Sequence, residues 1–148
     1  MYHAIVRRLI RNGFAALSQG DARPVVSQFA EDGTLTFSGT HALGGERRGP
    51  EAVAAWFAQL ASLFPGLRIA PLAIVVAGWP WNTTVATRFR VDARLPDGTA
   101  YENEGMQFVR VRFGTILEDY IYEDTAKLER ALETIAAYQT KANGVAAR

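Results

Sequence analysis

Three polar residues in the C-terminal half of the chain, Asn103, Gln107 and Asp119, stand where the surrounding pattern would place apolar side chains. Burial in an apolar pocket can raise the pKa of a carboxyl group by roughly 3 to 5 units, so an aspartate there could give and take protons near neutral pH. Side-chain amides beside it could hold or polarise an oxygen of a ligand. These residue types indicate acid-base chemistry, provided that they point into one interior.

The alternation of charge along the predicted strand at residues 100–113 decides which way they point. Its even positions include four charged residues, whereas its odd positions, among them Tyr101, Asn103 and Gln107, carry none. Successive side chains of a strand point to opposite faces of the sheet. The odd positions therefore face inward.

The same rule applies to the neighbouring strands. In the preceding strand it places Phe89 inside and the arginines outside. In the last strand, residues 115–122, Leu117, Asp119 and Ile121 share one face, and the two apolar neighbours indicate that Asp119 points inward.

Buried polar groups need partners, because each one left without a hydrogen bond costs about 1 to 3 kcal/mol. One interpretation is that the three side chains satisfy one another, backbone groups and water. The other is that they line a cavity and bind its contents. The sequence leaves both interpretations open.

The elements that hold these residues follow from local spacing. Helical periodicity predicts a helix before Gly20, a short one capped by Asp21, one that begins at Pro50 and one capped by Asp124. Alternating patterns predict strands at 34–39, 67–77, 83–95, 100–113 and 115–122, with residues 40–49 as a loop. Pro71 lacks a backbone donor, so its strand lies at an edge or is bulged there. Helices followed by an antiparallel meander indicate an α+β fold, with the helices on one face of the sheet.

Length and composition exclude several classes of protein. A chain of 148 residues suits one domain, expected at residues 1–140 with a flexible tail at 141–148. A net charge of +1 without a basic cluster predicts no nucleic-acid partner, and the chain has no apolar run of roughly 20 residues that would predict a membrane span. The absence of cysteine suits a reducing cytoplasm, and His3 and His41 are too far apart in sequence to indicate a metal site.

The order of elements resembles the nuclear transport factor 2-like superfamily, which includes SnoaL-like polyketide cyclases, ketosteroid isomerase and limonene epoxide hydrolase. The likeness is strongest in LPDGTAYENEGMQFVRVRFGTILEDYIYED, where a Pro-x-Gly turn precedes a Gly-x-Gln-x-x-Arg stretch, a Gly-x-Ile hairpin and a closing Asp. It implies a cone-shaped curved sheet around helices, with a deep apolar pocket for a small apolar metabolite and no cofactor.

The resemblance implies roles for four positions. Gln107 stands where the cyclases often have a pocket aspartate, and the family's aspartate on the last strand falls on Ile121, which has no chemistry. Asp119 lies on the same face and could take over as acid-base residue. His41 lies near the place of the general base of ketosteroid isomerase, so Asp119 and His41 are the catalytic candidates.

The remaining expected contacts are with an apolar substrate. Besides Asn103 and Gln107, the expected substrate-binding residues are Trp56, Phe89 and Tyr101. Three functions stay open: a cofactor-free isomerase, cyclase or hydratase/hydrolase acting on a carbonyl-containing metabolite, a non-catalytic binding protein, and a dimeric interaction module. Exposed aromatic residues on the outer sheet face, Phe108, Tyr120 and Tyr122, predict a homodimer.

Overall fold

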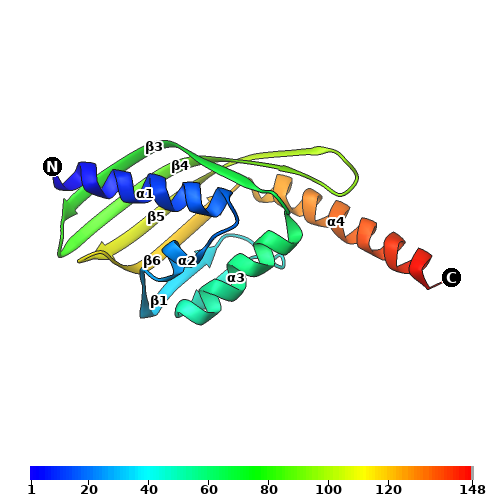
Figure 1. Cartoon of the computed structure of the whole chain (residues 1–148), viewed down its shortest axis with the longest axis horizontal. Coiled ribbons are helices and arrows are strands. Elements are labelled where there is room, and N and C mark those ends of the chain that lie inside the picture. The colour runs from blue at the N-terminus through cyan, green and yellow to red at the C-terminus, as the bar shows by residue number, and fades with distance from the viewer. Residues whose placement is uncertain (148) are drawn as a thin grey trace.

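A computed structural model describes residues 1–147, which form helices packed on a single sheet (Figure 1). The helices are α1 (Tyr2–Ser18), α2 (Arg23–Val26), α3 (Pro50–Leu63) and α4 (Thr125–Ala146). The strands are β1 (Phe29–Phe37), β2 (Gly45–Arg48), β3 (Arg68–Trp79), β4 (Asn82–Arg94), β5 (Ala100–Arg112) and β6 (Thr115–Glu123). α1, α2 and α3 lie over one face of the sheet, as the sequence predicts, while α4 extends away from it.

The strand order of the sheet is β2-β1-β6-β5-β4-β3. β3 to β6 form the predicted antiparallel meander, whereas β1 pairs in parallel with β6 and antiparallel with β2. The α+β class is confirmed. The expectation of a loop throughout residues 40–49 is wrong, because residues 45–48 form β2, a short edge strand that shows no alternation of apolar and polar residues and depends on β1 for its hydrogen bonds.

The predicted inner and outer faces of β4 and β5 are confirmed. The buried positions alternate along both strands: Val85, Thr87, Phe89 and Val91 on β4, and Tyr101, Asn103, Gly105 and Val109 on β5. The outer face carries ion pairs between the strands, at 2.8 Å for Arg88 with Glu104 and 3.2 Å for Arg90 with Glu102. Since these pairs are exposed, they stabilise the sheet little.

A bulge in β6 changes the predicted pattern at one position. The register shifts so that Val111 lies opposite Ile116 and Arg110 lies opposite Glu118, which leaves Leu117 without a partner. Ile116 is therefore buried in the core and Leu117 is only half-buried. The expectation that Leu117 shares the inner face with Asp119 is wrong, because an extra residue in one strand reverses the alternation beyond it.

Gly105 makes room for an aromatic ring on the inner sheet face. Gly105 lies opposite Phe89 on β4 and opposite Glu123 on β6. A Cβ atom at this position would collide with the Phe89 ring and with the Tyr122 carbonyl oxygen. A glycine within a strand often marks such a close approach.

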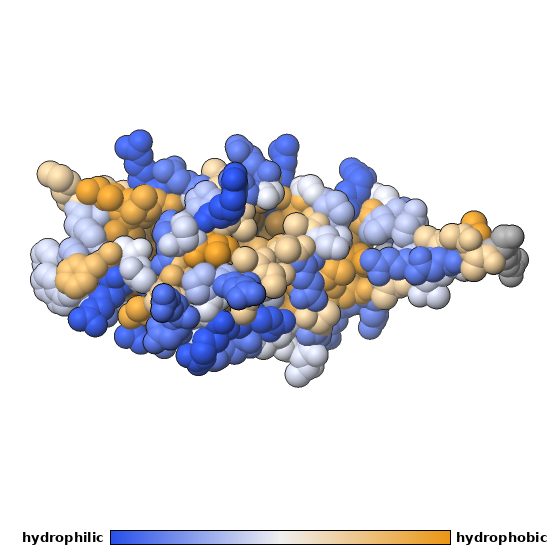
Figure 2. All heavy atoms as spheres, turned by 60° about the horizontal axis from the view of Figure 1, so that its bottom comes forward, coloured by the Kyte–Doolittle hydropathy of each residue, from blue (hydrophilic) through white to orange (hydrophobic). Residues whose placement is uncertain are grey.

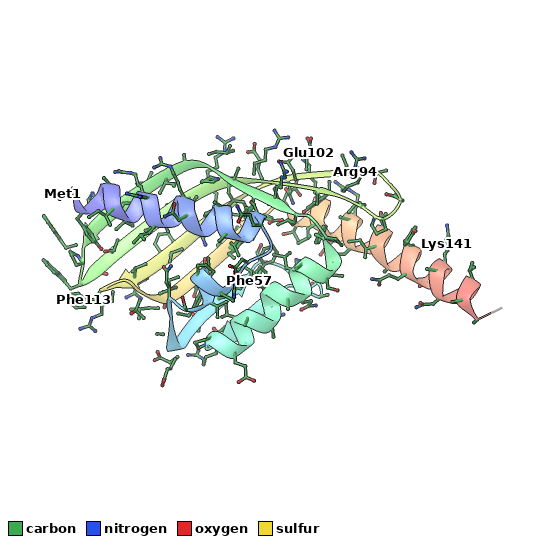
Figure 3. The ribbon with its side chains drawn as sticks, in the orientation of Figure 1. Met1, Phe57, Arg94, Glu102, Phe113 and Lys141 are labelled. Carbon is green, nitrogen blue, oxygen red and sulfur yellow. The ribbon has the colours of Figure 1, made fainter. Side chains whose placement is uncertain are left out.

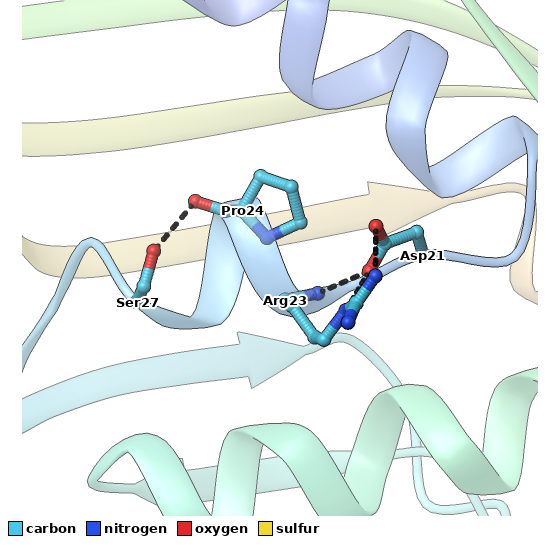
Figure 4. Close-up of polar contacts among 4 residues, drawn as sticks. All are labelled: Asp21, Arg23, Pro24 and Ser27. Carbon is cyan, nitrogen blue, oxygen red and sulfur yellow. Dashed lines mark hydrogen bonds and ion pairs between the residues drawn. The ribbon is translucent and has the colours of Figure 1, made fainter.

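Pro71 and Asp21 are two residues whose positions the sequence analysis predicts. Pro71 lies in the edge strand β3 next to a register shift, so both alternatives predicted for it are realised. Asp21 does not cap α2 in the usual way. Its Oδ1 atom accepts hydrogen bonds from the backbone N–H and from Nε of Arg23, at 3.1 and 2.8 Å (Figure 4). Ala22 holds the N-cap position.

The last helix is longer than the sequence predicts. Asp124 caps α4 as expected, since its side chain accepts a hydrogen bond from the backbone N–H of Lys127 at 3.2 Å. The helix then continues through Lys141 (Figure 3) to Ala146, although a tail is expected from residue 141. Arg148, also part of the expected tail, lies outside the described residues. Across residues 1–147 no helix has the length and apolar character needed to cross a membrane.

Candidate functional site

A cavity of about 350 Å³ lies between the helices and the inner face of the sheet. α1 contacts β3, and α3 contacts β1 and β2, so the two helices cover the two opposite edges of the same sheet face. The middle strands β5 and β6 face the hollow between them. Figure 2 shows hydrophobic side chains gathered near the centre of one face of the molecule, bordered by hydrophilic ones.

The lining of the cavity is largely apolar. It includes Phe14, Leu17, Trp56, Phe57, Leu60, Phe89, Val109 and Ile121. Phe57 projects from α3 on the side that faces the sheet (Figure 3). From β5 and β6 the polar or titratable lining residues are Gln107, Asp119 and Glu123. The helical side of the cavity adds the polar residues Ser18, Gln19 and Gln28, so the carboxyl groups of the lining are those of Asp119 and Glu123 on β6.

Asp119 and Gln107 form a hydrogen-bonded pair on the inner sheet face. Gln107 lies opposite Ile121 and Asp119 opposite Val109, so the two side chains are diagonal neighbours. Nε2 of Gln107 donates to Oδ2 of Asp119 at 2.9 Å. Oδ1 of Asp119 and Oε1 of Gln107 are buried and have no hydrogen-bond partner within the described residues. Each residue of the pair thus keeps one oxygen whose hydrogen-bonding capacity the described residues do not use.

The environment of Asp119 favours its neutral form. Asp119 is 2% exposed, and this burial raises the pKa of its carboxyl from 3.8 to about 7. The hydrogen bond from Gln107 acts in the opposite direction and favours the carboxylate. Near neutral pH both forms are populated, as a group that alternates between general acid and general base requires.

Glu123 is a second carboxyl group of the cavity, and the sequence analysis missed it. Its Oε2 atom accepts hydrogen bonds from Oη of Tyr101 and Nδ2 of Asn103, each at 3.3 Å. Burial raises the pKa of Glu123 to about 7, against the effect of these two hydrogen bonds. Glu123 lies just beyond the predicted end of the last strand at residue 122. It has the same parity as Asp119 and Ile121, and this signal could have revealed it.

Asn103 and Tyr101 are buried as predicted, but they do not line the cavity. Nδ2 of Asn103 donates to Oη of Tyr101 at 2.8 Å and to the Asp124 carbonyl oxygen at 3.1 Å, and its Oδ1 accepts from the Glu104 backbone N–H at 2.9 Å. Burial, with the nearby Glu123 carboxylate as second cause, raises the pKa of Tyr101. The expected direct contact of both residues with substrate is corrected: they lie behind Glu123 and hold it.

His41 does not lie at the cavity, contrary to the sequence-based expectation. The loop after β1 folds back so that Nε2 of His41 bonds to the Ser38 carbonyl oxygen at 3.0 Å. Nδ1 accepts from the Leu43 backbone N–H at 3.2 Å, and the ring packs edge-on against Phe37. Both nitrogens serve the loop. This arrangement leaves neither of them directed at a ligand.

Trp56 and Phe89 both line the cavity, where the sequence predicts substrate contacts. Nε1 of Trp56 donates to the Leu43 carbonyl oxygen at 2.9 Å, which fixes the indole as a wall. The Phe89 ring packs against Phe14 of α1, with ring centroids 5.9 Å apart.

Within residues 1–147 no group of three or more His, Cys, Asp or Glu side chains is placed to hold a metal ion.

The cone of curved sheet and helices around an internal cavity defines the class, a nuclear transport factor 2-like fold. Residues 10–119 match the family model of the SnoaL-like domain, and since this is more than half of the chain, the chain belongs to that family. A search of curated proteins gave no match.

Solved structures with the same fold are distant in sequence. IdmH from Streptomyces antibioticus, a proposed polyketide cyclase, is 22% identical over 86% of this chain and 97% of its own, with a TM-score of 0.70. PrhC from Penicillium brasilianum is 15% identical over 89% of this chain and 88% of its own, with a TM-score of 0.74. TerC, co-crystallised with polyporic acid, is 19% identical over 85% of this chain and 96% of its own, with a TM-score of 0.68. At these identities the likeness shows the fold alone.

Proposed function

We propose that this protein is a small-molecule enzyme that catalyses cofactor-free proton transfer on an apolar, carbonyl-containing metabolite. One observation carries the proposal. Asp119 and Gln107 are hydrogen-bonded to each other at the wall of a largely apolar cavity, and each keeps one buried oxygen without a partner in the described residues, which is costly. A ligand hydroxyl group that donates to these oxygens, or a ligand carbonyl that accepts from the neutral form of Asp119, would remove this cost.

Each of the two residues has a role in such a reaction. As a carboxylate, Asp119 takes a proton from the carbon next to the ligand carbonyl, which becomes an enolate. Nε2 of Gln107 carries a second N–H besides the one donated to Asp119, and this N–H stabilises the enolate oxygen, while Oε1 accepts a hydrogen bond from a hydroxyl group of the ligand. The neutral Asp119 then returns the proton to another atom of the same ligand. No proton is gained or lost overall, so an isomerisation or ring closure needs no cofactor.

The family and the fold support the class of ligand. The chain belongs to the SnoaL-like family, IdmH is described as a proposed polyketide cyclase, and TerC was crystallised with an organic acid. These proteins suggest small organic molecules as ligands, and the apolar lining around Asp119 agrees with them.

A non-catalytic binding protein is the alternative, and two residues favour it. Gln107 replaces the aspartate that the resemblance leads one to expect, and Ile121 occupies the expected place of another. Because both expected aspartates are absent, Asp119 has no second carboxyl group beside it on the sheet between α1 and α3. The Asp119–Gln107 pair could therefore orient a ligand without reacting with it.

Deuterium exchange separates the two functions. The protein is incubated in D₂O with a panel of cyclic and straight-chain ketones, ligand binding is followed by thermal shift, and deuterium incorporation next to the carbonyl is followed by mass spectrometry. We expect exchange with the unmodified protein and none with Asp119→Asn. The matched control is Glu118→Gln, since Glu118 pairs with Arg110 at 3.2 Å on the outer face. Binding without exchange would support the non-catalytic alternative.

A further inference from the structure

The cavity has a second polar position far from the Asp119–Gln107 pair. Asp119, Ile121 and Glu123 follow one another along the inner face of β6 and all line the cavity. A strand rises about 3.3 Å per residue, so the Cα atoms of Asp119 and Glu123 lie about 13 Å apart. Between them on β6 lies Ile121, which is opposite Gln107 of β5, and Phe89 of β4 lies in the same row as Glu123.

Glu123 is held in place on one side only. Its Oε2 atom accepts from Tyr101 and Asn103, and Asn103 is itself fixed by the Asp124 carbonyl oxygen and the Glu104 backbone N–H. No hydrogen bond within the described residues uses Oε1. The carboxyl group is thus oriented by a buried network, with one oxygen left for another partner.

Beyond accepting the hydrogen bonds of Tyr101 and Asn103 with one oxygen, Glu123 has neither a capping role nor an ion pair within the described residues. Asp124, not Glu123, caps α4 with its side chain, and none of the ion pairs within residues 1–147 includes Glu123. The Tyr101 ring already packs against Phe64, with centroids 5.1 Å apart. An apolar residue at position 123 would extend that packing, whereas a carboxyl group has to be desolvated.

We propose that Glu123, oriented by Tyr101 and Asn103, is a second ligand-binding position that accepts a hydrogen bond from a hydroxyl group at the far end of an elongated apolar ligand. The inference rests on the proposed function, in which the ligand carbonyl lies at Asp119 and Gln107. It narrows the substrate class to long, mainly apolar molecules with a carbonyl near one end and a hydroxyl near the other, separated by about 10 Å or more. Tyr101 and Asn103 act as positioning residues.

Calorimetric titration with three matched ketones tests this position. The probes are a straight-chain methyl ketone of about ten carbons, the same ketone with a hydroxyl group at its far end, and the methyl ether of that hydroxyl. We expect the hydroxy ketone to bind the unmodified protein about tenfold more tightly than either of the others, because the ether cannot donate a hydrogen bond to Glu123. This comparison needs no variant.

Variants then assign the effect to a residue. Glu123→Leu should remove the tenfold advantage of the hydroxy ketone, Tyr101→Phe should reduce it, and Glu118→Gln, on the outer face, should keep it. Equal affinities of the three ketones for the unmodified protein, or an advantage that survives in Glu123→Leu, would overturn the proposal. Asp119-dependent deuterium exchange without a hydroxyl advantage overturns this inference alone. A hydroxyl advantage without exchange supports it and contradicts catalysis.

Discussion

Ionisation of Asp119 should make the folded protein less stable as the pH rises. In the unfolded chain this carboxyl has an ordinary pKa near 3.8, and in the fold burial raises its pKa to about 7. Between these values the folded state binds more protons than the unfolded state, so the free energy of unfolding falls with increasing pH. The contribution of Asp119 to the free energy of unfolding is fully present below about pH 3.8, and it is lost as the pH rises through about 7. Asp119→Asn removes this titration.

The size of the effect follows from the two pKa values. A difference of about three pH units corresponds to about 4 kcal/mol when fully expressed. Between pH 5 and pH 8 roughly 2 to 3 kcal/mol of it is lost. Glu123, whose pKa rises from 4.5 to about 7, contributes a similar amount over the same range. Against a typical total of about 5 to 15 kcal/mol, this loss is large.

Urea unfolding at pH 5 and pH 8, followed by tryptophan fluorescence, measures the effect. We expect the unmodified protein to lose about 5 kcal/mol between these pH values, Asp119→Asn and Glu123→Gln to lose about half as much each, and the double variant to lose little. Glu118→Gln should behave like the unmodified protein. An Asp119→Asn variant with the full pH dependence would refute the reasoning, since the titrating group would then lie elsewhere.

Three further predictions concern other parts of the chain. Gly105→Ala should lower the free energy of unfolding by about 2 kcal/mol or more, because the added Cβ would collide with the Phe89 ring and a backbone carbonyl. Thermal unfolding measures this loss, and an unchanged melting temperature would contradict the close approach. His41→Ala should cost about 1 kcal/mol through lost loop hydrogen bonds while deuterium exchange persists, and loss of exchange in a folded variant would restore His41 as a catalytic candidate. We also propose that the outer sheet face, where Phe108 and Tyr122 are 45% and 55% exposed, pairs with a second copy; sedimentation should give a dimer that Phe108→Ser weakens, and a monomer at micromolar concentration would count against it.

The inner face of the sheet was predictable because its signal is local. Charge alternation along β4 and β5 indicates the buried positions, and Ile121 correctly indicates the direction of Asp119, whereas Leu117 does not share that face. What the sequence could not give depends on contacts between distant segments. The bulge at Leu117 is set by pairing with β5, and β2 exists only because β1 lies beside it.

The expected cavity positions of Asn103, Tyr101 and His41 are wrong for a related reason, although Asp119 and Gln107 line the cavity. Alternation tells which face a side chain occupies, but the depth along that face depends on where the helices end. Asn103 and Tyr101 lie inward, as predicted, yet they fall behind Glu123, beyond the cavity. His41 was placed by analogy with a position in other proteins, and the loop instead uses both of its nitrogens.

The cost of the two buried carboxyl groups argues for a ligand in the cavity. Each group destabilises the fold near neutral pH, and neither has an ion-pair partner within residues 1–147. The helices leave a cavity over the inner face of β5 and β6. Bulkier side chains on α1 or α3 could fill this cavity, in the way that aromatic rings pack around Trp56. A chain shaped by stability alone would have an apolar residue at 119 or 123. A molecule that bonds to Asp119 and Glu123 offsets both costs at once, so its binding should raise the stability most above pH 7, where the unliganded fold is weakest.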